Sequence, residues 1–551
     1  MKRIVAAVAA VLLVAGCAGA PSGAGNSTAA ARPKLVVFLV VDGLPQRQVV
    51  DYRDQLVPDG LRRFLDRGAW FSDAHYGQAI TQTAPGHAVM LTGAYPHRTG
   101  IIANEWLDPR TGETEYCTGD TTSTYIGHKT NKLDGTSPKN LKAETVGDVL
   151  KRMDGRSKVI AISGKDRGAI LPAGKTGVPY MYQSDSGQFA TATFYMKEHP
   201  QWVNDFNAKK PADAYFGHEW KPLLAESAYA KSVPDDQKWY MKGGKLPMKM
   251  GDGLKGPDRA FYGSLLRSPY ADELSLAFAR AAIAGEGLGR DDAPDILSIS
   301  LSGHDYINHA YSAESRLSHD HLLRLDRMFQ DLFRDLDATV GRDNYVAVLT
   351  ADHGFMPAPE HSKTLGRDAG TVNTKDMMAR LNAGLSQKFG EAQWSTGVSA
   401  QGVLLNQKTI ADKGATREAV ENEARAILMK EQGIAAVTTR TELERGLKPG
   451  DPFAEQLRKT WHRELSADLQ ITLKPYWMMA SSSGYASTHG SPYAYDSNVP
   501  ILFYGPAWVK PGRIDTRVEV ADIAPTLSRM LGVPAPSSAE GKLLPLGAAS
   551  R

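Results

Sequence analysis

Hydrophobic residues occur along the chain as short continuous runs, beginning with KLVVFLVV at residues 34–41. Continuous apolar runs rich in β-branched residues are typical of strands that are covered on both faces, as in parallel sheets. The pattern predicts five such buried strands, at residues 34–41, 158–163, 295–301, 345–350 and 499–504.

Segments with helical periodicity lie between these runs, at residues 60–67, 313–339 and 521–531. Strands that alternate with helices indicate an α/β fold with a mostly parallel central sheet sandwiched by helices. Two stretches, near residues 170–270 and 370–480, break the alternation, and we expect them to be insertions that cap one edge of the sheet. Residues 34–551 would then form one large domain.

Composition and charge narrow the class of protein. The chain has 551 residues, of which 42% are hydrophobic and 23% charged, which excludes collagen-like, coiled-coil and wholly disordered classes. Its 64 basic and 61 acidic residues nearly balance, and no block of Lys and Arg stands out. Nucleic acid is therefore not an expected partner.

The N-terminus has the pattern of a secretion signal. Three residues, Met1 to Arg3, form a basic start, and residues 4–15 are an apolar stretch. As a helix that stretch would rise about 18 Å, too short for a hydrocarbon core of roughly 30 Å. We therefore interpret residues 1–16 as a signal peptide.

The small residues before Cys17 resemble the lipobox of bacterial lipoproteins. We expect Cys17 to be lipidated and residues 17–33 to form a flexible tether, with the protein anchored by lipid in the periplasm or at the cell surface. A plain signal peptide cut near Ala20 is the alternative.

Acidic residues and histidines follow three of the predicted strands. Asp42 follows the first, Asp305 and His309 follow residues 295–301, and Asp352 and His353 follow residues 345–350. Ligands of open α/β sheets bind outside the carboxyl ends of the strands, and such side chains suit a zinc-type ion. Each motif alone also occurs as a turn or by chance, but their joint occurrence favours a metal site.

Thr83 stands at the start of a predicted helix. Pro85 fits the first turn, which places Thr83 at or just before the N-cap. One interpretation is a capping threonine and nothing more. The other is that a helix N-terminus binds phosphate, and a hydroxyl that also touches a metal there is an activated nucleophile.

Together the motifs Thr-x-Pro-Gly-His-Ala, Asp-x-x-x-His, Asp-His-Gly and a late Thr-His-Gly resemble the alkaline phosphatase superfamily. Within it the chain is most similar to the phosphate-irrepressible, threonine-nucleophile alkaline phosphatases of bacterial periplasms, over roughly residues 34–540. The resemblance implies two Zn²⁺ per chain and Thr83 as the phosphorylated nucleophile. It implies one zinc held by Asp305, His309 and His489, and another held by Asp42, Asp352 and His353 with Thr83 at its open position.

Three further residues match the family's phosphate-binding positions. Asn104 matches its phosphate-binding asparagine, and Lys165 with Arg167 matches the Lys-x-Arg pair of the monoesterases. A phosphomonoester dianion exposes three non-bridging oxygens, so two added cations favour it over a singly charged diester. The alternative for this pair is two solvated charges in a turn.

The resemblance implies an alkaline phosphatase that hydrolyses small-molecule phosphate monoesters for phosphate scavenging. We expect a monomer that the lipid on Cys17 attaches to the membrane. Two alternatives stay open: a phosphodiesterase or nucleotide pyrophosphatase of the same superfamily, and a non-catalytic surface lipoprotein on this scaffold. The nearby His319, Asp320 and His321 look like a further metal cluster. Residues at i and i+2 diverge on a helix, so we expect them to form a solvated face.

Overall fold

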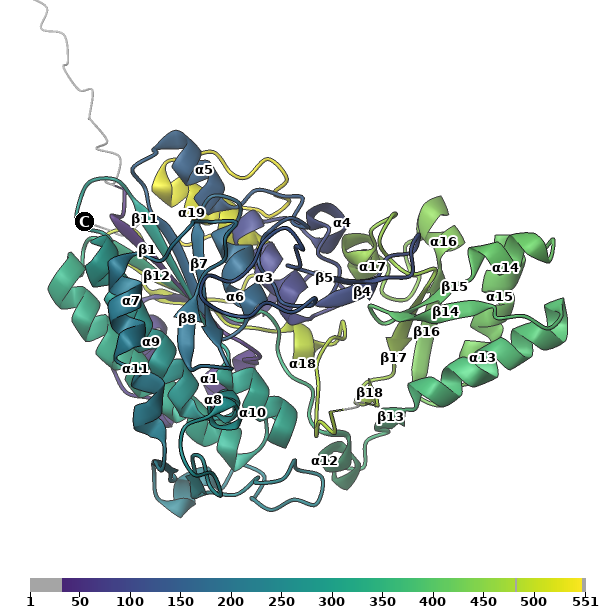
Figure 1. The fold of residues 1–551 in the computed structure, drawn as a ribbon, viewed down its shortest axis with the longest axis horizontal. Coiled ribbons are helices and arrows are strands. Elements are labelled where there is room, and N and C mark those ends of the chain that lie inside the picture. Colours follow the sequence, from purple (N-terminus) through teal and green to yellow (C-terminus); the bar gives the residue numbers. More distant parts are fainter. Residues whose placement is uncertain (1–31, 481–482, 548–551) are drawn as a thin grey trace, which may run out of the picture. The chain divides into compact units, whose positions relative to one another are not determined.

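The computed structural model describes residues 32–480 and 483–547. The predicted signal peptide, Cys17 and most of the tether lie outside these residues. All five predicted strands form, and they belong to one sheet (Figure 1). Within the described residues the sheet has nine strands. In spatial order they are β20 (Gly512–Ile514), β2 (Ala69–Phe71), β19 (Ile501–Tyr504), β12 (Tyr345–Thr350), β1 (Leu35–Val41), β11 (Asp295–Leu301), β6 (Val159–Ser163), β7 (Val178–Gln183) and β8 (Gln188–Ala190).

The five strands from β12 to β7 run parallel, and β19 and β8 pair antiparallel at their two sides. Every residue of β1 and β11 is buried. This burial is the physical reason for the unbroken apolar run at residues 34–41, because both faces of the strand contact helices rather than water.

Helices cover both faces of the sheet, which confirms the predicted α/β sandwich. On one face α9 packs against β6 and β11, and α7, α10 and α11 pack against α9; on the other, α6 packs against β6 and β7, with α3, α5 and α19 beside it (Figure 1). These helices are α3 (Thr83–Thr92), α5 (Val146–Met153), α6 (Asp166–Ala173), α7 (Gln201–Ala208), α9 (Pro269–Glu286), α10 (Gly303–Tyr311), α11 (Arg316–Leu336) and α19 (Ile523–Leu531).

The prediction of a solvated face at residues 319–321 is wrong. His319, Asp320 and His321 lie on α11 and are fully buried. The His319 ring stacks on Tyr52 with 3.6 Å between centroids, and Asp320 accepts a hydrogen bond of 2.6 Å from Trp220 Nε1. The segment that contains Trp220 covers this side of α11, which periodicity within the helix did not reveal.

The two predicted insertions differ in character. Residues 170–270 include β7 and β8, so this insertion begins later than the sequence suggested. Residues 370–480 contain a separate antiparallel sheet with its own hydrophobic core, which we call the cap. The cap consists mainly of β14 (Ser395–Ser399), β15 (Gly402–Leu405), β17 (Leu469–Leu473), β16 (Ile434–Thr439), α13 (Thr374–Phe389) and α15 (Arg417–Leu428).

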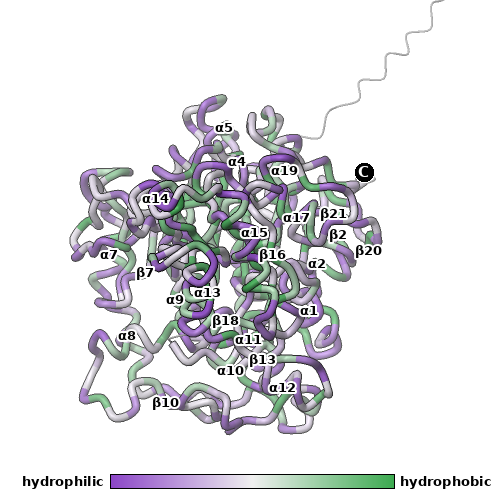
Figure 2. Tube along the Cα trace, turned by 90° about the vertical axis from the view of Figure 1, so that its right-hand side faces the viewer, coloured by the Kyte–Doolittle hydropathy of each residue, from purple (hydrophilic) through white to green (hydrophobic). Residues whose placement is uncertain are grey.

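The cap helix α13 contains both hydrophilic and hydrophobic residues (Figure 2), and Met377, Leu381 and Leu385 are its buried apolar ones. Among the helices that the structure describes, none combines the length and the apolar character needed to cross a membrane.

Candidate metal and phosphate site

The predicted strand-end residues meet because three central strands end level. Val40 of β1 pairs with Ser300 of β11 on one side and with Thr350 of β12 on the other. The residues that follow these strands therefore project from the same edge of the sheet, at their carboxyl ends. These residues include Asp42, Asp305, His309, Asp352 and His353.

Two groups of carboxylates and imidazoles have the spacing of metal ligands. In the first, Asp305 Oδ1 lies 3.4 Å from His309 Nε2 and 3.5 Å from His489 Nε2. In the second, His353 Nε2 lies 3.5 Å from Asp42 Oδ1 and 3.9 Å from Asp305 Oδ1. The His353 and His489 rings stack with 3.3 Å between centroids, so the two groups adjoin.

The second group differs in one member from the set that the family resemblance implied. The structure joins Asp42 and His353 with Asp305, which thus borders both groups. Asp352 lies beside them, with Oδ2 3.4 Å from His353 Nε2 and Oδ1 accepting a hydrogen bond of 2.9 Å from Gly43 N. Its role as a metal ligand stays a prediction.

Backbone carbonyls orient the three histidines. Nδ1 of His309 contacts the carbonyl of Ser487 at 2.9 Å, and Nδ1 of His489 contacts the carbonyl of Thr81 at 2.8 Å. His353 Nδ1 makes the same type of contact with the carbonyl of Gly354 at 2.9 Å. Carbonyls only accept, so each Nδ1 carries the proton and each Nε2 presents its lone pair to the site.

The charge states of the three histidines fit a bound divalent cation. Burial lowers the pKa of His309, His353 and His489, which keeps the rings in the neutral form that binds metals. Burial raises the pKa of Asp42 well above its usual value, with repulsion from Asp352 added.

Several buried carboxylate oxygens at this edge have no hydrogen-bond partner among the described residues. They include Asp42 Oδ1, Asp305 Oδ1 and Asp352 Oδ2. Unpaired buried carboxylates are costly, and metal coordination is one of the few ways to satisfy them. Oxygen and imidazole nitrogen donors in these numbers suit zinc, so the residues present fit the two ions that the resemblance implies.

Lys165 brings a buried positive charge between the two groups. It precedes α6, and its Nζ lies 2.7 Å from Asp42 Oδ2 and 2.6 Å from Asp305 Oδ2. Burial alone would lower the pKa of Lys165, but these two carboxylates raise it above its usual value. The lysine is therefore charged, and its side chain is only 2% exposed.

Arg167, the second residue of α6, donates from Nη1 to the Tyr116 hydroxyl at 3.0 Å, while its buried Nε has no partner among the residues described. The alternative of two solvated charges does not fit this burial.

Thr83 is the first residue of α3, one position inside the helix, because Gln82 occupies the N-cap. Its Oγ1 lies 3.5 Å from His353 Nε2. Gly86 lets the helix approach the end of β12 so closely, since a Cβ there would lie 2.2 Å from the Asp352 carbonyl oxygen. The hydroxyl therefore faces the metal-ligand groups from a helix N-terminus.

Asn104 lies beside this helix start. Its Oδ1 accepts a hydrogen bond of 2.8 Å from Ala84 N, and its own backbone N–H donates to Gln82 Oε1 at 3.1 Å. Because Oδ1 is used for the helix, the Nδ2 amide is the end that remains for an anion. Sequence reasoning missed Gln82, since a glutamine before a helix carries no distinctive signal.

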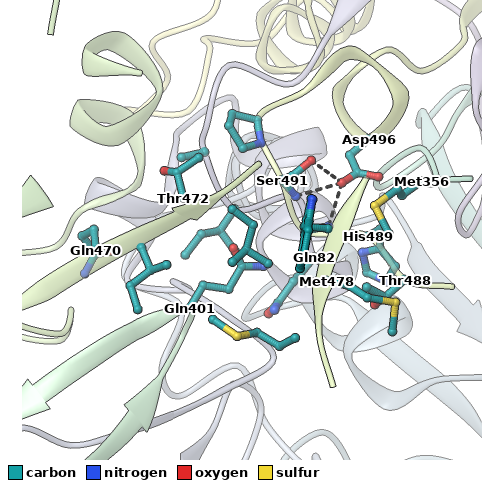
Figure 3. Close-up of a pocket in the computed structure, with 18 of the residues that line it drawn as sticks. Gln82, Met356, Gln401, Gln470, Thr472, Met478, Thr488, His489, Ser491 and Asp496 are labelled. Carbon is teal, nitrogen blue, oxygen red and sulfur yellow. Dashed lines mark hydrogen bonds between the residues drawn. The ribbon is translucent and has the colours of Figure 1, made fainter. Parts of the chain in front are cut away.

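Two cavities adjoin the site. One, of about 200 Å³, lies between the core and the cap and reaches the site at His489 and Gln82 (Figure 3). The other, of about 310 Å³, is lined by Lys165, Arg167 and Tyr306. A further residue without a sequence signal is Tyr485, whose ring stacks on His309 with 4.4 Å between centroids.

Comparison with known proteins agrees with this geometry. The model of the type I phosphodiesterase / nucleotide pyrophosphatase family matches residues 36–492. The alkaline phosphatase PafA of Elizabethkingia meningoseptica is 34% identical over 544 residues, which cover 97% of this chain and 97% of that protein. A protein of Myroides odoratus named calcium-transporting ATPase is 34% identical over 513 residues, which cover 92% of this chain and 93% of that protein.

The solved structure of wild-type alkaline phosphatase PafA matches with a TM-score of 0.87 at 32% identity, covering 95% of this chain and 100% of that one. The order of the motifs, the arrangement of the site and these matches lead to one conclusion. The chain belongs to the type I phosphodiesterase / nucleotide pyrophosphatase family, within the alkaline phosphatase superfamily.

Proposed function

We propose that the protein is a phosphoester hydrolase that cleaves phosphate monoesters at a site for two zinc ions, with Thr83 as the nucleophile. The observation that carries the proposal is the meeting of Thr83, the buried Lys165 and two Asp/His groups at one edge of the sheet. The alkaline phosphatase names of several relatives support the same reaction class.

Each side chain has a distinct task in this reaction. Thr83 Oγ1 attacks phosphorus in line with the leaving oxygen, which forms a phospho-threonine that water then hydrolyses. Asn104, Lys165 and Arg167 bind the non-bridging oxygens and hold the phosphoryl group in place. Bound zinc would stabilise negative charge on the attacking and the leaving oxygen.

A diesterase is the second candidate, since the matching family includes phosphodiesterases. The two cations Lys165 and Arg167 favour a monoesterase over a diesterase. Lys165 and Arg167 place two positive charges at the end of β6, and a monoester dianion offers one more charged oxygen to them than a diester does. We therefore propose monoesters as the substrates.

Removal of metal tests the proposal. Treatment with a chelator should abolish turnover of p-nitrophenyl phosphate, and zinc added back should restore it only as two equivalents bind per chain. The measurement is bound zinc and turnover on the same samples, with circular dichroism to verify the fold. Full activity in metal-free protein would contradict the two-ion site.

We also propose that the chain is exported and held by a lipid on Cys17. The variant Cys17→Ser should block lipidation, and either the uncleaved precursor or a protein released from membranes should accumulate. Labelling with a radioactive fatty acid checks this expectation. Equal lipid incorporation in the variant and the wild type would overturn the assignment.

A further inference from the structure

A third, larger opening lies next to the cavity that contains Lys165 and Arg167. This cavity of about 780 Å³ is lined among others by Arg259, Arg267, Tyr306 and Tyr485, and we call it the outer cleft. Arg259 and Tyr306 also line the cavity that contains Lys165 and Arg167. The two openings therefore adjoin each other at these two side chains, next to the proposed phosphate-binding Lys165 and Arg167.

The tyrosines place the outer cleft next to one of the two metal-ligand groups. Tyr306 follows Asp305 directly on α10, and Tyr485 stacks on His309. Asp305 and His309 form one ligand group with His489, whereas Thr83 Oγ1 lies beside His353 of the other group. Lys165 Nζ lies 5.0 Å from the centre of the Tyr306 ring, which places the phosphate-binding lysine beside the same wall.

The nucleophile lies by a different opening. Gln82, the residue before Thr83, lines the cavity between the core and the cap (Figure 3). An in-line displacement places the leaving group opposite the attacking oxygen, so the leaving group points away from the start of α3. The outer cleft is lined by neither Gln82 nor Thr83, and its Tyr485 stacks on His309, so it is a candidate opening for the leaving group.

The two arginines of the outer cleft differ in whether their charges are paired. Arg267 makes no ion pair or side-chain hydrogen bond with any residue that the structure describes, although its side chain is exposed at the cleft wall. Arg259 pairs with Asp185 at 2.9 Å, but these side chains are 79% and 47% exposed, so the pair is weak and open to exchange.

The acidic residue of the cleft has a structural task. Asp258 accepts a hydrogen bond of 2.9 Å from Phe261 N and caps helix α8 (Arg259–Leu265). The negative charge of Asp258 thus interacts with the N-terminus of α8. The Arg267 guanidinium is available to bind a ligand.

We propose that the outer cleft receives the alcohol part of the phosphate monoester, and that Arg267, assisted by Arg259, favours leaving groups that carry a negative charge such as a carboxylate. The aromatic walls contributed by Tyr306 and Tyr485 suit a flat or apolar portion of the same group. This inference rests on the monoesterase function proposed above and adds a class of substrate to it.

The experiment compares two substrates that differ by one carboxylate on the leaving group, phenyl phosphate and 4-carboxyphenyl phosphate. In Arg267→Ala, kcat/KM for the carboxylated substrate should fall by about two- to fivefold relative to phenyl phosphate, as expected for one exposed ion pair. The loss should shrink at high salt, because screening already weakens this contact in the wild type. Arg259→Ala/Arg267→Ala should lower the ratio further.

Arg290→Ala is the matched control. Arg290 is also exposed, but it lies before β11, at the opposite edge of the sheet from the site. Its removal should leave the substrate ratio unchanged. An unchanged ratio in Arg267→Ala, or an equal loss on both substrates, would overturn the role of the cleft while the phosphatase stands. Failure of the wild type to hydrolyse phenyl phosphate at all would overturn the proposed function as well.

Discussion

Replacing Thr83 with alanine is expected to lower turnover of p-nitrophenyl phosphate by on the order of 10³-fold or more, because the variant lacks the attacking oxygen. The change removes a small side chain from the first turn of α3, where alanine is well tolerated, so the fold should persist. The measurements are kcat and bound zinc on the same preparation.

Thr83→Ser is the matched control for this variant. Serine keeps the hydroxyl and loses only a methyl group, so it should retain substantial activity. Near-normal turnover by metal-loaded Thr83→Ala would exclude Thr83 as the nucleophile. A loss of zinc that accounts for the lost activity would instead make Thr83 a metal ligand without a role in attack.

The second large effect is expected when the two cations Lys165 and Arg167 are removed. Each charge-assisted contact is worth roughly 10- to 150-fold if it acts fully in the transition state. Lys165→Ala/Arg167→Ala should therefore lower kcat/KM for p-nitrophenyl phosphate by on the order of 10²-fold or more, without strict additivity. Activity on bis-p-nitrophenyl phosphate should fall much less, because that diester has one fewer charged oxygen.

The single variants Lys165→Ala and Arg167→Ala distinguish binding of the substrate dianion from support of the metal site. Lys165 contacts both Asp42 and Asp305, so its loss alters the charge around the candidate ligands. Arg167 makes no ion pair with these carboxylates and hydrogen-bonds Tyr116 instead. Arg167→Ala should show the monoester-specific loss at unchanged zinc content. An equal loss on both substrates in Arg167→Ala would contradict recognition of the dianion.

The central sheet was predictable because its strands leave a direct trace in the sequence. Burial on both faces of β1 and β11 requires apolar residues without alternation, and polar ligands can follow only where such a strand ends. For the same reason the sequence predicted Asp42, Asp305 and Asp352 at the carboxyl-end edge of the sheet. β7 and β8 escaped prediction because β7 contains Pro179 and β8 has three residues, so neither gives an unbroken apolar run.

Contacts between distant segments were not predictable. The burial of His319 and Asp320 depends on packing by residues around Trp220, about 100 positions earlier in the chain. Asp305 borders both ligand groups because His353 and His489 both lie near its Oδ1 in space, which spacing along the chain does not encode. His489 itself was reached through the family resemblance, because its loop follows no predicted strand directly.

Trapping the covalent intermediate tests the central claim most directly. Metal-loaded enzyme would be mixed with a radiolabelled phosphate monoester, quenched in acid and digested, and the labelled peptide sequenced by mass spectrometry. We predict a phosphoryl group on Thr83, absent from Thr83→Ala and present on the serine of Thr83→Ser. Label on a different residue, or undiminished turnover in Thr83→Ala, would contradict the account.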